Sequence, residues 1–348
     1  MILVISMEYI ELDGSMLEGG GGLVRTAVAM SALTKKPVKI FNIRAKRPNP
    51  GLKSQHLTAI KCVAALCNAK VIGLKLNSTQ IEFIPGDEIL GKKLRVDVGT
   101  AGSITLVLQA LTLPAIFASS EVNLEIKGGT DVPFSCPVDY YKNVLIPLFQ
   151  KFGVRMELEV VRRGFYPRGG GLVRVKYKPM KFSEVRKVNL VDRGTLLRIE
   201  GISFASRDLE RAKVAERQAL AAKKILISKF NKDVRIWTEY KTTSSPGSGI
   251  VVWAKYSNTI LGGDSLGEKG KVSEKVGREA AEKLLREVER DACVDSHAAD
   301  NLIPFMSLSP GSSIKTSEIS LHTRTNIWVC EKFMGGKFKI EGSTIHYS

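Results

Sequence analysis

Residues 320–326 read Ser-Leu-His-Thr-Arg-Thr-Asn, a mostly polar segment that contains a histidine. The apolar pattern predicts a strand over residues 319–321 that ends at His322, and a helix over residues 327–333 that follows it. A helix N-terminus offers free backbone N–H groups, which favour a phosphate. Neutral imidazole is also a nucleophile near pH 7. His322, beside Arg324, can therefore attack a phosphate and carry it covalently; the alternative is a histidine that merely starts a helix.

Two glycine-rich turns lie where a predicted strand meets a predicted helix. The first covers residues 18–22 and opens a helix that carries Arg25, and the second covers residues 99–103 and precedes Gln109. Glycines let a ligand approach the backbone closely, and the carboxylate of Glu18 can hold a metal that bridges phosphates. Neither turn matches a P-loop or a dinucleotide fingerprint. A plain turn is the alternative for both.

A basic segment runs over residues 44–56 and is stiffened by two prolines. It carries Arg44 and Arg47, and it leads into a predicted helix with Gln55 and His56 in the first turn. Arginines on a stiff loop suit the binding of phosphates. The alternative is a solvated basic loop without a ligand.

Two further segments carry polar residues that suit a nucleotide. Residues 128–131 (Gly-Gly-Thr-Asp) follow a predicted strand and could place Asp131 near a metal or a sugar. His297 and Asp300 are three residues apart, which places them on one face of a predicted helix. This pair indicates either an edge that binds adenosine or a simple side-chain pair.

The charge of the chain indicates a polyanionic partner. The 348 residues include 52 Lys and Arg against 35 Asp and Glu, which gives a formal net charge of +17. The excess is clustered, because residues 35–53 and residues 162–181 each contain seven basic side chains and no acidic one. Nucleic acid is the first candidate partner and an anionic membrane surface the second.

Other features of composition narrow the class of protein. No run of 18 apolar residues occurs, so no membrane-spanning helix is expected, and we expect a soluble, cytoplasmic protein. The five cysteines include no Cys-x-x-Cys, which argues against a zinc site and a disulfide framework. Cys62, Cys67 and Cys330 lie in apolar patterns and are expected in the core.

One local pattern recurs three times, namely a strand, a small or polar turn, a helix and another strand. The copies begin near residues 9, 94 and 319. This predicts an α/β (α+β) fold in which three repeated α/β units form a large domain. Residues 185–270 interrupt the pattern and predict a smaller inserted α/β domain, so that residues 1–184 and 271–348 form the large one. A helix over residues 138–152 should be kinked or shortened by Pro147.

Taken together, these segments resemble the RNA 3′-terminal phosphate cyclase family. The resemblance covers about residues 7 to 342, and its motifs stand in the family's order. They are residues 18–25, 44–56, 99–109, 128–131, 164–171, 294–302 and 321–326.

The resemblance implies an ATP-dependent reaction of the ligase class. A histidine attacks the α-phosphate of ATP, which releases pyrophosphate and leaves a histidine–AMP phosphoramidate. AMP then moves to the 3′-phosphate of the RNA, and the ribose 2′-OH attacks that phosphorus to give a 2′,3′-cyclic phosphate and AMP. The implied partners are ATP, RNA 3′-phosphate ends and Mg²⁺ or Mn²⁺. The implied fold, three α/β units with an inserted domain, agrees with the pattern read above.

The family's roles can be carried over to matching positions. His322 falls on the nucleophile and Glu18 on the metal-binding carboxylate. Positions that contact phosphate or RNA fall on Arg25, Arg44, Arg47 and Gln55. Positions near the nucleotide fall on Gln109, Pro133, His297, Asp300 and Asn301. The chain departs from the family's pattern at Gly22, which is often glutamine, and at His297, which is often an aromatic residue that packs on adenine.

Two other functions fit parts of the sequence. Some cyclase-like relatives act without catalysis in ribosome assembly, but they lack the nucleophilic histidine that is present here as His322. A transferase acting on a small phosphorylated metabolite would not need a net charge of +17. The sequence leaves the oligomeric state open.

Overall fold

The computed structural model describes residues 8–348 and contains, within them, three copies of one unit. Each copy runs strand, helix, strand, helix, strand, strand. The first copy consists of β1 (Ile10–Asp13), α1 (Gly21–Thr34), β2 (Val38–Phe41), α2 (Ser54–Cys67), β3 (Lys70–Ile72) and β4 (Ile81–Ile84). The second consists of β5 (Lys93–Asp97), α3 (Ile104–Ile116), β6 (Val122–Gly128), a broken helix over residues 138–151, β7 (Arg155–Arg162) and β8 (Gly171–Lys178). The third consists of β9 (Asn189–Leu190), α8 (Ser296–Met306), β14 (Ser313–Lys315), α9 (Leu321–Met334), β15 (Phe338–Glu341) and β16 (Thr344–Tyr347).

The strand pairing is the same in all three copies. The first strand lies parallel to the second, which is antiparallel to the fourth, which is antiparallel to the third. The sheets therefore have the orders β1-β2-β4-β3, β5-β6-β8-β7 and β9-β14-β16-β15. The prediction of repeated α/β units is confirmed.

The sequence predicted that the third copy begins near residue 319. That prediction is wrong, because the segment that starts there forms the second half of the third unit. Residues 319–321 form no strand, because Ser320 is the N-cap of α9 and its side chain accepts a hydrogen bond from the backbone N–H of Thr323 (3.1 Å). The helix after it, α9, is the second helix of the third unit. The equivalent of α1 and α3 is α8, and its preceding strand β9 lies more than 100 residues earlier in the chain.

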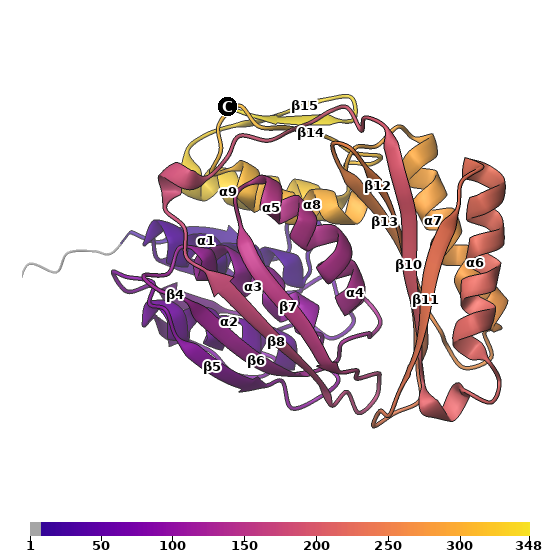
Figure 1. The fold of residues 1–348 in the computed structure, drawn as a ribbon. Helices are drawn as coiled ribbons and strands as arrows, with labels where there is room; N and C mark the ends of the chain where they lie inside the picture. The colour runs from indigo at the N-terminus through magenta and orange to yellow at the C-terminus, as the bar shows by residue number, and fades with distance from the viewer. Residues whose placement is uncertain (1–7) are drawn as a thin grey trace, which may run out of the picture.

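A second α/β body separates β9 from α8. It consists of β10 (Leu196–Ser206), α6 (Val214–Phe230), β11 (Val234–Lys241), β12 (Ser248–Tyr256), β13 (Ile260–Leu266) and α7 (Ser273–Glu289). Figure 1 shows its sheet facing the three-unit body, with α6 and α7 on the outer side. Because α7 packs against α6 and β13, we propose that the inserted domain runs from about Leu196 to Glu289 and does not end at residue 270.

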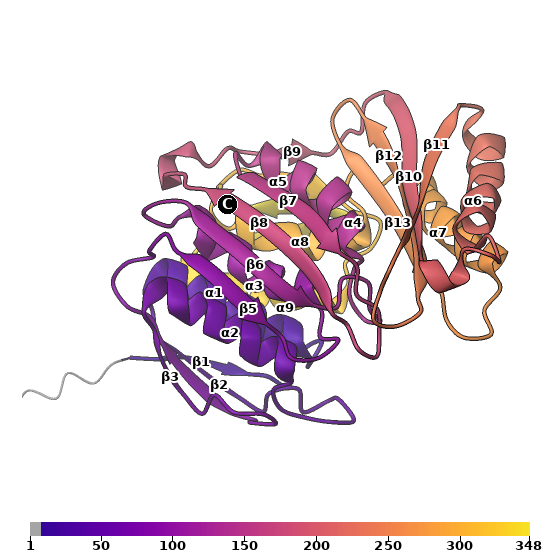
Figure 2. The same cartoon turned by 60° about the horizontal axis from the view of Figure 1, so that its bottom comes forward.

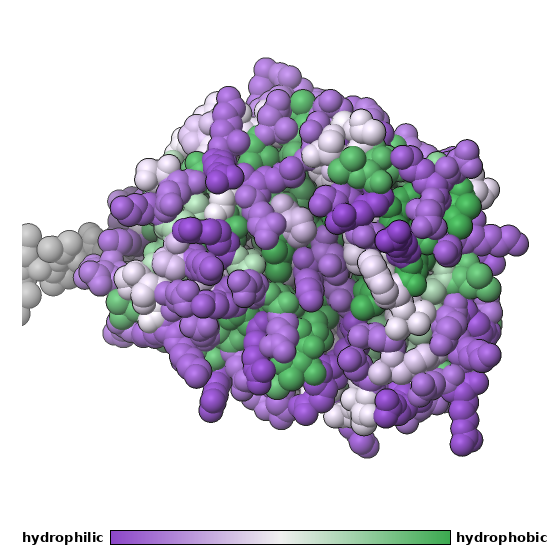
Figure 3. Space-filling view, viewed as in Figure 1, coloured by the Kyte–Doolittle hydropathy of each residue, from purple (hydrophilic) through white to green (hydrophobic). Residues whose placement is uncertain are grey.

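Helices occupy the centre of the three-unit body and the sheets lie outside them (Figures 1 and 2). The sequence requires this layering, because α3 is apolar all round and buries 12 of its 13 residues, all except Gln109. The outer surface is mainly hydrophilic on the face shown in Figure 3. Cys62, Cys67 and Cys330 are buried as predicted. Within residues 8–348, no helix has the length and apolar character that a membrane span requires.

The helix that contains Pro147 is irregular, as predicted. It consists of α4 (Val138–Tyr140), a π-helical turn η1 (Tyr141–Leu145) and α5 (Ile146–Lys151). Proline has no N–H to donate, so the backbone widens into the π-turn just before it. Two other short turns, η2 (Phe182–Glu184) and η3 (Arg207–Leu209), are 3₁₀ helices in connecting segments.

A buried arginine joins the inserted domain to the second unit. Arg163 is 2% exposed and donates to three carboxylates, Asp131 (3.0 Å) and Asp139 (2.6 Å) from the second unit and Glu239 (2.5 Å) from β11. Its guanidinium also lies 3.8 Å from the centre of the Phe204 ring in β10. The contacts tie two separate bodies together through one side chain.

Arg163→Met should lower the stability of the whole chain by about 3–5 kcal/mol, because it leaves buried carboxylates without a counter-charge. A shift of the guanidinium chloride unfolding midpoint to lower concentration checks this. The matched control is Arg174→Met, whose exposed side chain pairs with carboxylates at the surface and should change the midpoint little. Equal shifts for the two variants would contradict the assigned role of Arg163.

Candidate active site

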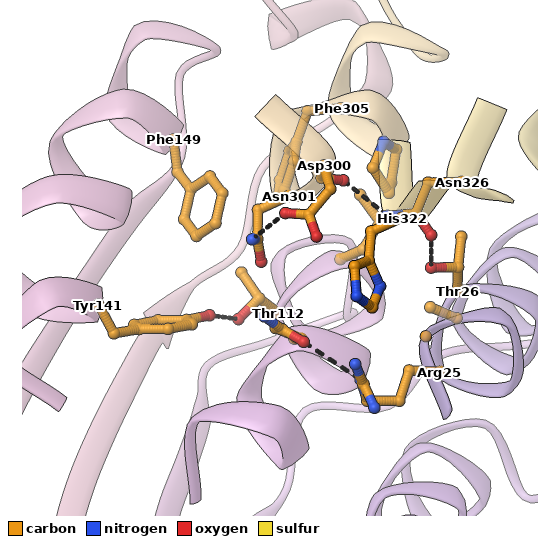
Figure 4. A pocket seen from close by; sticks show the side chains of 15 residues that line it. Arg25, Thr26, Thr112, Tyr141, Phe149, Asp300, Asn301, Phe305, His322 and Asn326 are labelled. Carbon is orange, nitrogen blue, oxygen red and sulfur yellow. Dashed lines mark hydrogen bonds between the residues drawn. The ribbon is translucent and has the colours of Figure 1, made fainter. Parts of the chain in front are cut away.

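A pocket lies where helices from all three units meet (Figure 4). Each helix supplies polar side chains to its wall. These are Arg25 and Thr26 from α1, Gln109 and Thr112 from α3, Asp300 and Asn301 from α8, and His322 and Asn326 from α9. Tyr141, Phe149 and Phe305 form an aromatic side of the same pocket. Five of the residues predicted for the site, from segments far apart in the sequence, thus share one cavity.

His322 is the second residue of α9, and its side chain is 49% exposed. Ser320 caps this helix, so the position at a helix N-terminus that the sequence predicted for His322 is confirmed. Its Nδ1 atom lies 3.8 Å from Oε2 of Glu18. In Figure 4 the imidazole ring lies between Asp300 and Arg25 and faces the cavity. The ring is therefore accessible to a ligand while charged groups surround it.

Glu18 is held beside His322 from two directions. Its backbone N–H donates to Oγ1 of Thr325 (3.2 Å), and its Oε1 atom forms an ion pair with Arg47. The side chain of Glu18 is only 6% exposed, and its Oε2 atom is buried without a hydrogen-bond partner in the structure. A buried oxygen of this kind needs a partner.

Arg25 projects from α1 into the pocket and donates through Nε to Oε1 of Gln109 (3.1 Å). Burial lowers the pKa of Arg25 to about 10, although the nearby Asp300 carboxylate opposes this change. The guanidinium remains charged at neutral pH. Because one hydrogen bond fixes its Nε, its two terminal nitrogens are available to a phosphate.

Burial also acts on the histidine. It lowers the pKa of His322 below the ordinary value of 6.5, and the Asp300 carboxylate works in the opposite direction. For Asp300 itself, burial raises the pKa. His322 is consequently neutral at pH 7, which is the protonation state that a nucleophile requires.

A chain of hydrogen bonds that the sequence did not reveal connects three helices behind His322. Oγ1 of Thr26 donates to Oδ1 of Asn326 (2.7 Å), and Nδ2 of Asn326 donates to the backbone oxygen of Asp300 (2.7 Å). Asn326 lies four residues after His322 on the same face of α9. Asn326 belongs to the segment 320–326 that the sequence had singled out; Thr26 carried no signal, because its partner is 300 residues away.

The glycine turn before α1 packs against a buried histidine. A Cβ atom on Gly21 would lie 2.2 Å from Nε2 of His56, so a larger residue there would require the buried His56 ring to move. The Nδ1 atom of His56 accepts from the backbone N–H of Lys53 (3.0 Å), which closes the N-terminus of α2. Burial lowers the pKa of His56 to about 3, with Arg25 and Arg44 adding to the effect. His56 is a neutral structural residue under the turn.

The remaining predicted residues lie around the pocket but do not line it. Oε1 of Gln55 accepts from the backbone N–H of Ser103 (3.2 Å), which joins α2 to the second glycine turn. Nη1 of Arg44 donates to the backbone oxygens of Asn49 (2.8 Å) and Gly51 (2.9 Å), so it shapes its own loop. Pro133 is exposed in the loop after β6.

On α8, the two predicted neighbours of Asp300 differ in their surroundings. Nδ2 of Asn301 donates to Oδ1 of Asp300 (2.6 Å) within the pocket wall. His297 is exposed one turn earlier, with its ring centre 6.3 Å from that of Tyr140 in an edge-on arrangement. Asp295 caps α8 and also accepts from the backbone N–H of Gly262 in β13 (2.9 Å), which fixes this helix against the inserted domain.

The side chains around Glu18 fit a divalent cation that takes one ligand from the protein and others from water and a substrate. Residues 8–348 contain no cluster of three or more His, Cys, Asp or Glu side chains that would hold a metal by itself. Mg²⁺ usually binds one or two carboxylates and completes its shell with water and substrate phosphates. The unpartnered Oε2 atom of Glu18 supplies one such ligand.

Comparison with known proteins shows the family to which the chain belongs. The family model described as RNA 3′-terminal phosphate cyclase matches residues 16–340. The chain is 48% identical over 331 residues to an RNA 3′-terminal phosphate cyclase of Pyrococcus furiosus, with 95% of each chain covered. A protein of the same name from Hyperthermus butylicus is 49% identical over 336 residues, covering 94% of this chain and 92% of its own.

A third relative, also named RNA 3′-terminal phosphate cyclase, comes from Methanopyrus kandleri. It is 46% identical over 343 residues, with 97% of this chain and 96% of the relative covered. The matched range includes every segment that forms the pocket. The chain belongs to the RNA 3′-terminal phosphate cyclase family.

Proposed function

We propose that this chain converts an RNA 3′-terminal phosphate into a 2′,3′-cyclic phosphate at the expense of ATP, with His322 as a covalent carrier of AMP. The observation that carries the proposal is the position of His322, an accessible imidazole between Glu18 and Arg25 in a pocket shared by three repeated units. Family membership supports the overall reaction, and the pocket geometry supports the covalent route.

In the first step, an imidazole nitrogen of His322 attacks the α-phosphorus of ATP. The N–P bond forms while the bond from phosphorus to the pyrophosphate oxygen breaks. Glu18 lies on the Nδ1 side of the ring, so its negative charge favours the tautomer with the proton on Nδ1. The lone pair on Nε2 is then free for attack, and Glu18 stabilises the positive charge that develops on the ring.

Arg25 and the helix N-termini supply the positive charge that the phosphates need. The guanidinium of Arg25 is held by Gln109 in a partly buried site, where its interaction with a phosphate is stronger than in water. When bound, a divalent cation at Oε2 of Glu18 would neutralise further phosphate charge. Arg47 already pairs with the other oxygen of Glu18, so it can orient that carboxylate.

The second and third steps return His322 to its free form. An oxygen of the RNA 3′-phosphate attacks the AMP phosphorus, which breaks the N–P bond and forms a phosphoanhydride. The ribose 2′-OH then attacks the activated 3′-phosphorus, loses its proton and expels AMP. Two basic clusters, residues 35–53 and 162–181, supply charge for binding the RNA.

His322→Ala should abolish covalent AMP and reduce cyclisation by several orders of magnitude, because the nucleophile is lost. The measurement is acid-labile, alkali-stable label on the protein after incubation with α-labelled ATP and Mg²⁺ or Mn²⁺. Binding of a 3′-phosphorylated RNA, measured separately, should be nearly unchanged. The control is His346→Ala, a histidine bonded to Ser313 on the third sheet. Label retained by His322→Ala would place the nucleophile elsewhere.

The rate of adenylation should rise with pH as His322 loses its proton and level off above an inflection that lies below pH 6.5, because burial lowers the pKa of His322. Measured at low ATP concentration, the second-order rate constant reports the free enzyme. Asp300→Asn should move the inflection to a more acidic pH, since the Asp300 charge raises the pKa of His322. An inflection well above pH 6.5, or one that Asp300→Asn leaves in place, would contradict this account.

Glu18→Gln should raise the concentration of Mg²⁺ or Mn²⁺ that gives half-maximal adenylation by about tenfold or more, because it removes the charged metal ligand. A metal titration followed by covalent label measures this. Equilibrium binding of Mn²⁺ in the presence of ATP gives a readout that does not depend on turnover. Glu11→Gln, on the exposed side of β1, is the matched control. An unchanged titration would assign Glu18 to positioning His322 only.

A further inference from the structure

Two exposed aromatic side chains lie on neighbouring loops that the reaction described above does not use. Phe134 is 100% exposed and has a positive φ of 65°, a conformation that a bulky residue rarely adopts. Tyr166 is 67% exposed. Apolar rings in solvent and a strained backbone are both costly, and residues that bear such costs are concentrated at functional sites.

The two loops are fixed to each other. The backbone N–H of Thr130 donates to the oxygen of Gly164 (2.9 Å), and Asp131 forms a β-bridge with Phe165. Arg163 holds Asp131 from the other loop through an ion pair (3.0 Å). Phe134 and Tyr166, here called the aromatic rim, therefore stand on one rigid support.

The loop that carries Phe134 contacts a helix that lines the candidate active site. The backbone oxygen of Cys136, two residues after Phe134, accepts from Oγ1 of Thr105 in the first turn of α3 (2.9 Å). Burial raises the pKa of Cys136 to about 12, and the carboxylates of Asp264 and Asp300 add to this. Asp300 lines the pocket. The loop that carries Phe134 is thus joined to α3, one of the helices that line the pocket.

The loop that carries Tyr166 also lies next to the start of α3. A Cβ atom on Gly169 would lie 2.8 Å from Cα of Ala101, which belongs to the glycine turn before α3. The loop with Tyr166 therefore packs directly on that turn. The two loops of the aromatic rim therefore both contact residues 101–105, at the start of α3. In this segment the backbone N–H of Ser103 donates to Gln55.

Two exposed arginines lie on either side of Tyr166 in the sequence. Arg162 and Arg168 are exposed at the two ends of the Tyr166 loop, and neither forms an ion pair within the part of the chain that the structure describes. The Nε atom of Arg162 donates to the backbone oxygen of Gly170 (2.6 Å), which leaves the rest of its guanidinium to solvent. Exposed aromatic rings beside unpaired arginines are the elements from which proteins build platforms for single-stranded nucleic acid.

We propose that the aromatic rim stacks on the nucleobases at the 3′ end of the RNA substrate, while Arg162 and Arg168 contact its backbone phosphates. The inference rests on the proposed RNA cyclisation. Two rings on two loops suit successive bases of a strand better than the single adenine of ATP. Since every base has a π-face, the binding should tolerate any sequence, and the platform would align the terminal ribose phosphate with the pocket.

The test uses the full chain and separates the half-reactions. Phe134→Ala and Tyr166→Ala should each raise KM for a 3′-phosphorylated oligoribonucleotide by roughly 5-fold to 100-fold, the range expected for one lost base stack. Phe134→Tyr and Tyr166→Phe should restore it. Covalent labelling by ATP without RNA should be unchanged in all four variants. Phe182→Ala removes a half-exposed aromatic beyond the far end of β8 and is the matched control.

A modified RNA identifies the stacking partner. An oligonucleotide without its 3′-terminal base should bind the wild-type chain more weakly, and Phe134→Ala or Tyr166→Ala should add no further loss with this substrate. A full additional loss in both variants, or equal KM values for all variants with normal RNA, would overturn the proposal. A fall in ATP labelling with unchanged KM for RNA would assign the rings to ATP and also overturn it. Failure of the wild type to cyclise RNA would instead refute the proposed function.

Discussion

The structure depends on the burial of helices between sheets. Each unit has one apolar sheet face, and α1 and α3 are too apolar to face water, so the helices of three units must pack on each other. Polar side chains on these helices then meet at one place. The pocket with His322, Arg25 and Asp300 is the result of this packing, since polar groups buried between helices need partners or a ligand.

Charged side chains inside this packing form two groups, one around Arg163 and one around Glu18. Around Arg163, one buried guanidinium donates to three carboxylates, which joins the inserted domain to the second unit. Around Glu18 the matching is incomplete, because Oε2 has no partner and Arg25 keeps free nitrogens. The first arrangement holds the body together, and the second leaves binding capacity for phosphate and a cation.

The insertion lies at a point where it can affect the site without supplying residues to the pocket wall. It interrupts the third unit between β9 and α8, and Asp295 fixes the start of α8 to β13. Asp300 and Asn301 follow on the same helix. The orientation of α8, which supplies one part of the pocket wall, is therefore influenced by contacts between the two domains, and the loops of the aromatic rim are joined to the inserted domain through Asp131 and Arg163.

The sequence alone determined the type of most of the elements it singled out, because helical periodicity and glycine turns are local features. It also placed His322 at a helix N-terminus. It placed the third repeat wrongly, since residues 319–321 have the composition of a strand but no sheet partner, and the true first strand β9 is separated by the insertion. Only tertiary structure decided the contacts of Thr26 with Asn326 and of Arg163 with Glu239, because no local pattern records partners that are 300 or 76 residues apart.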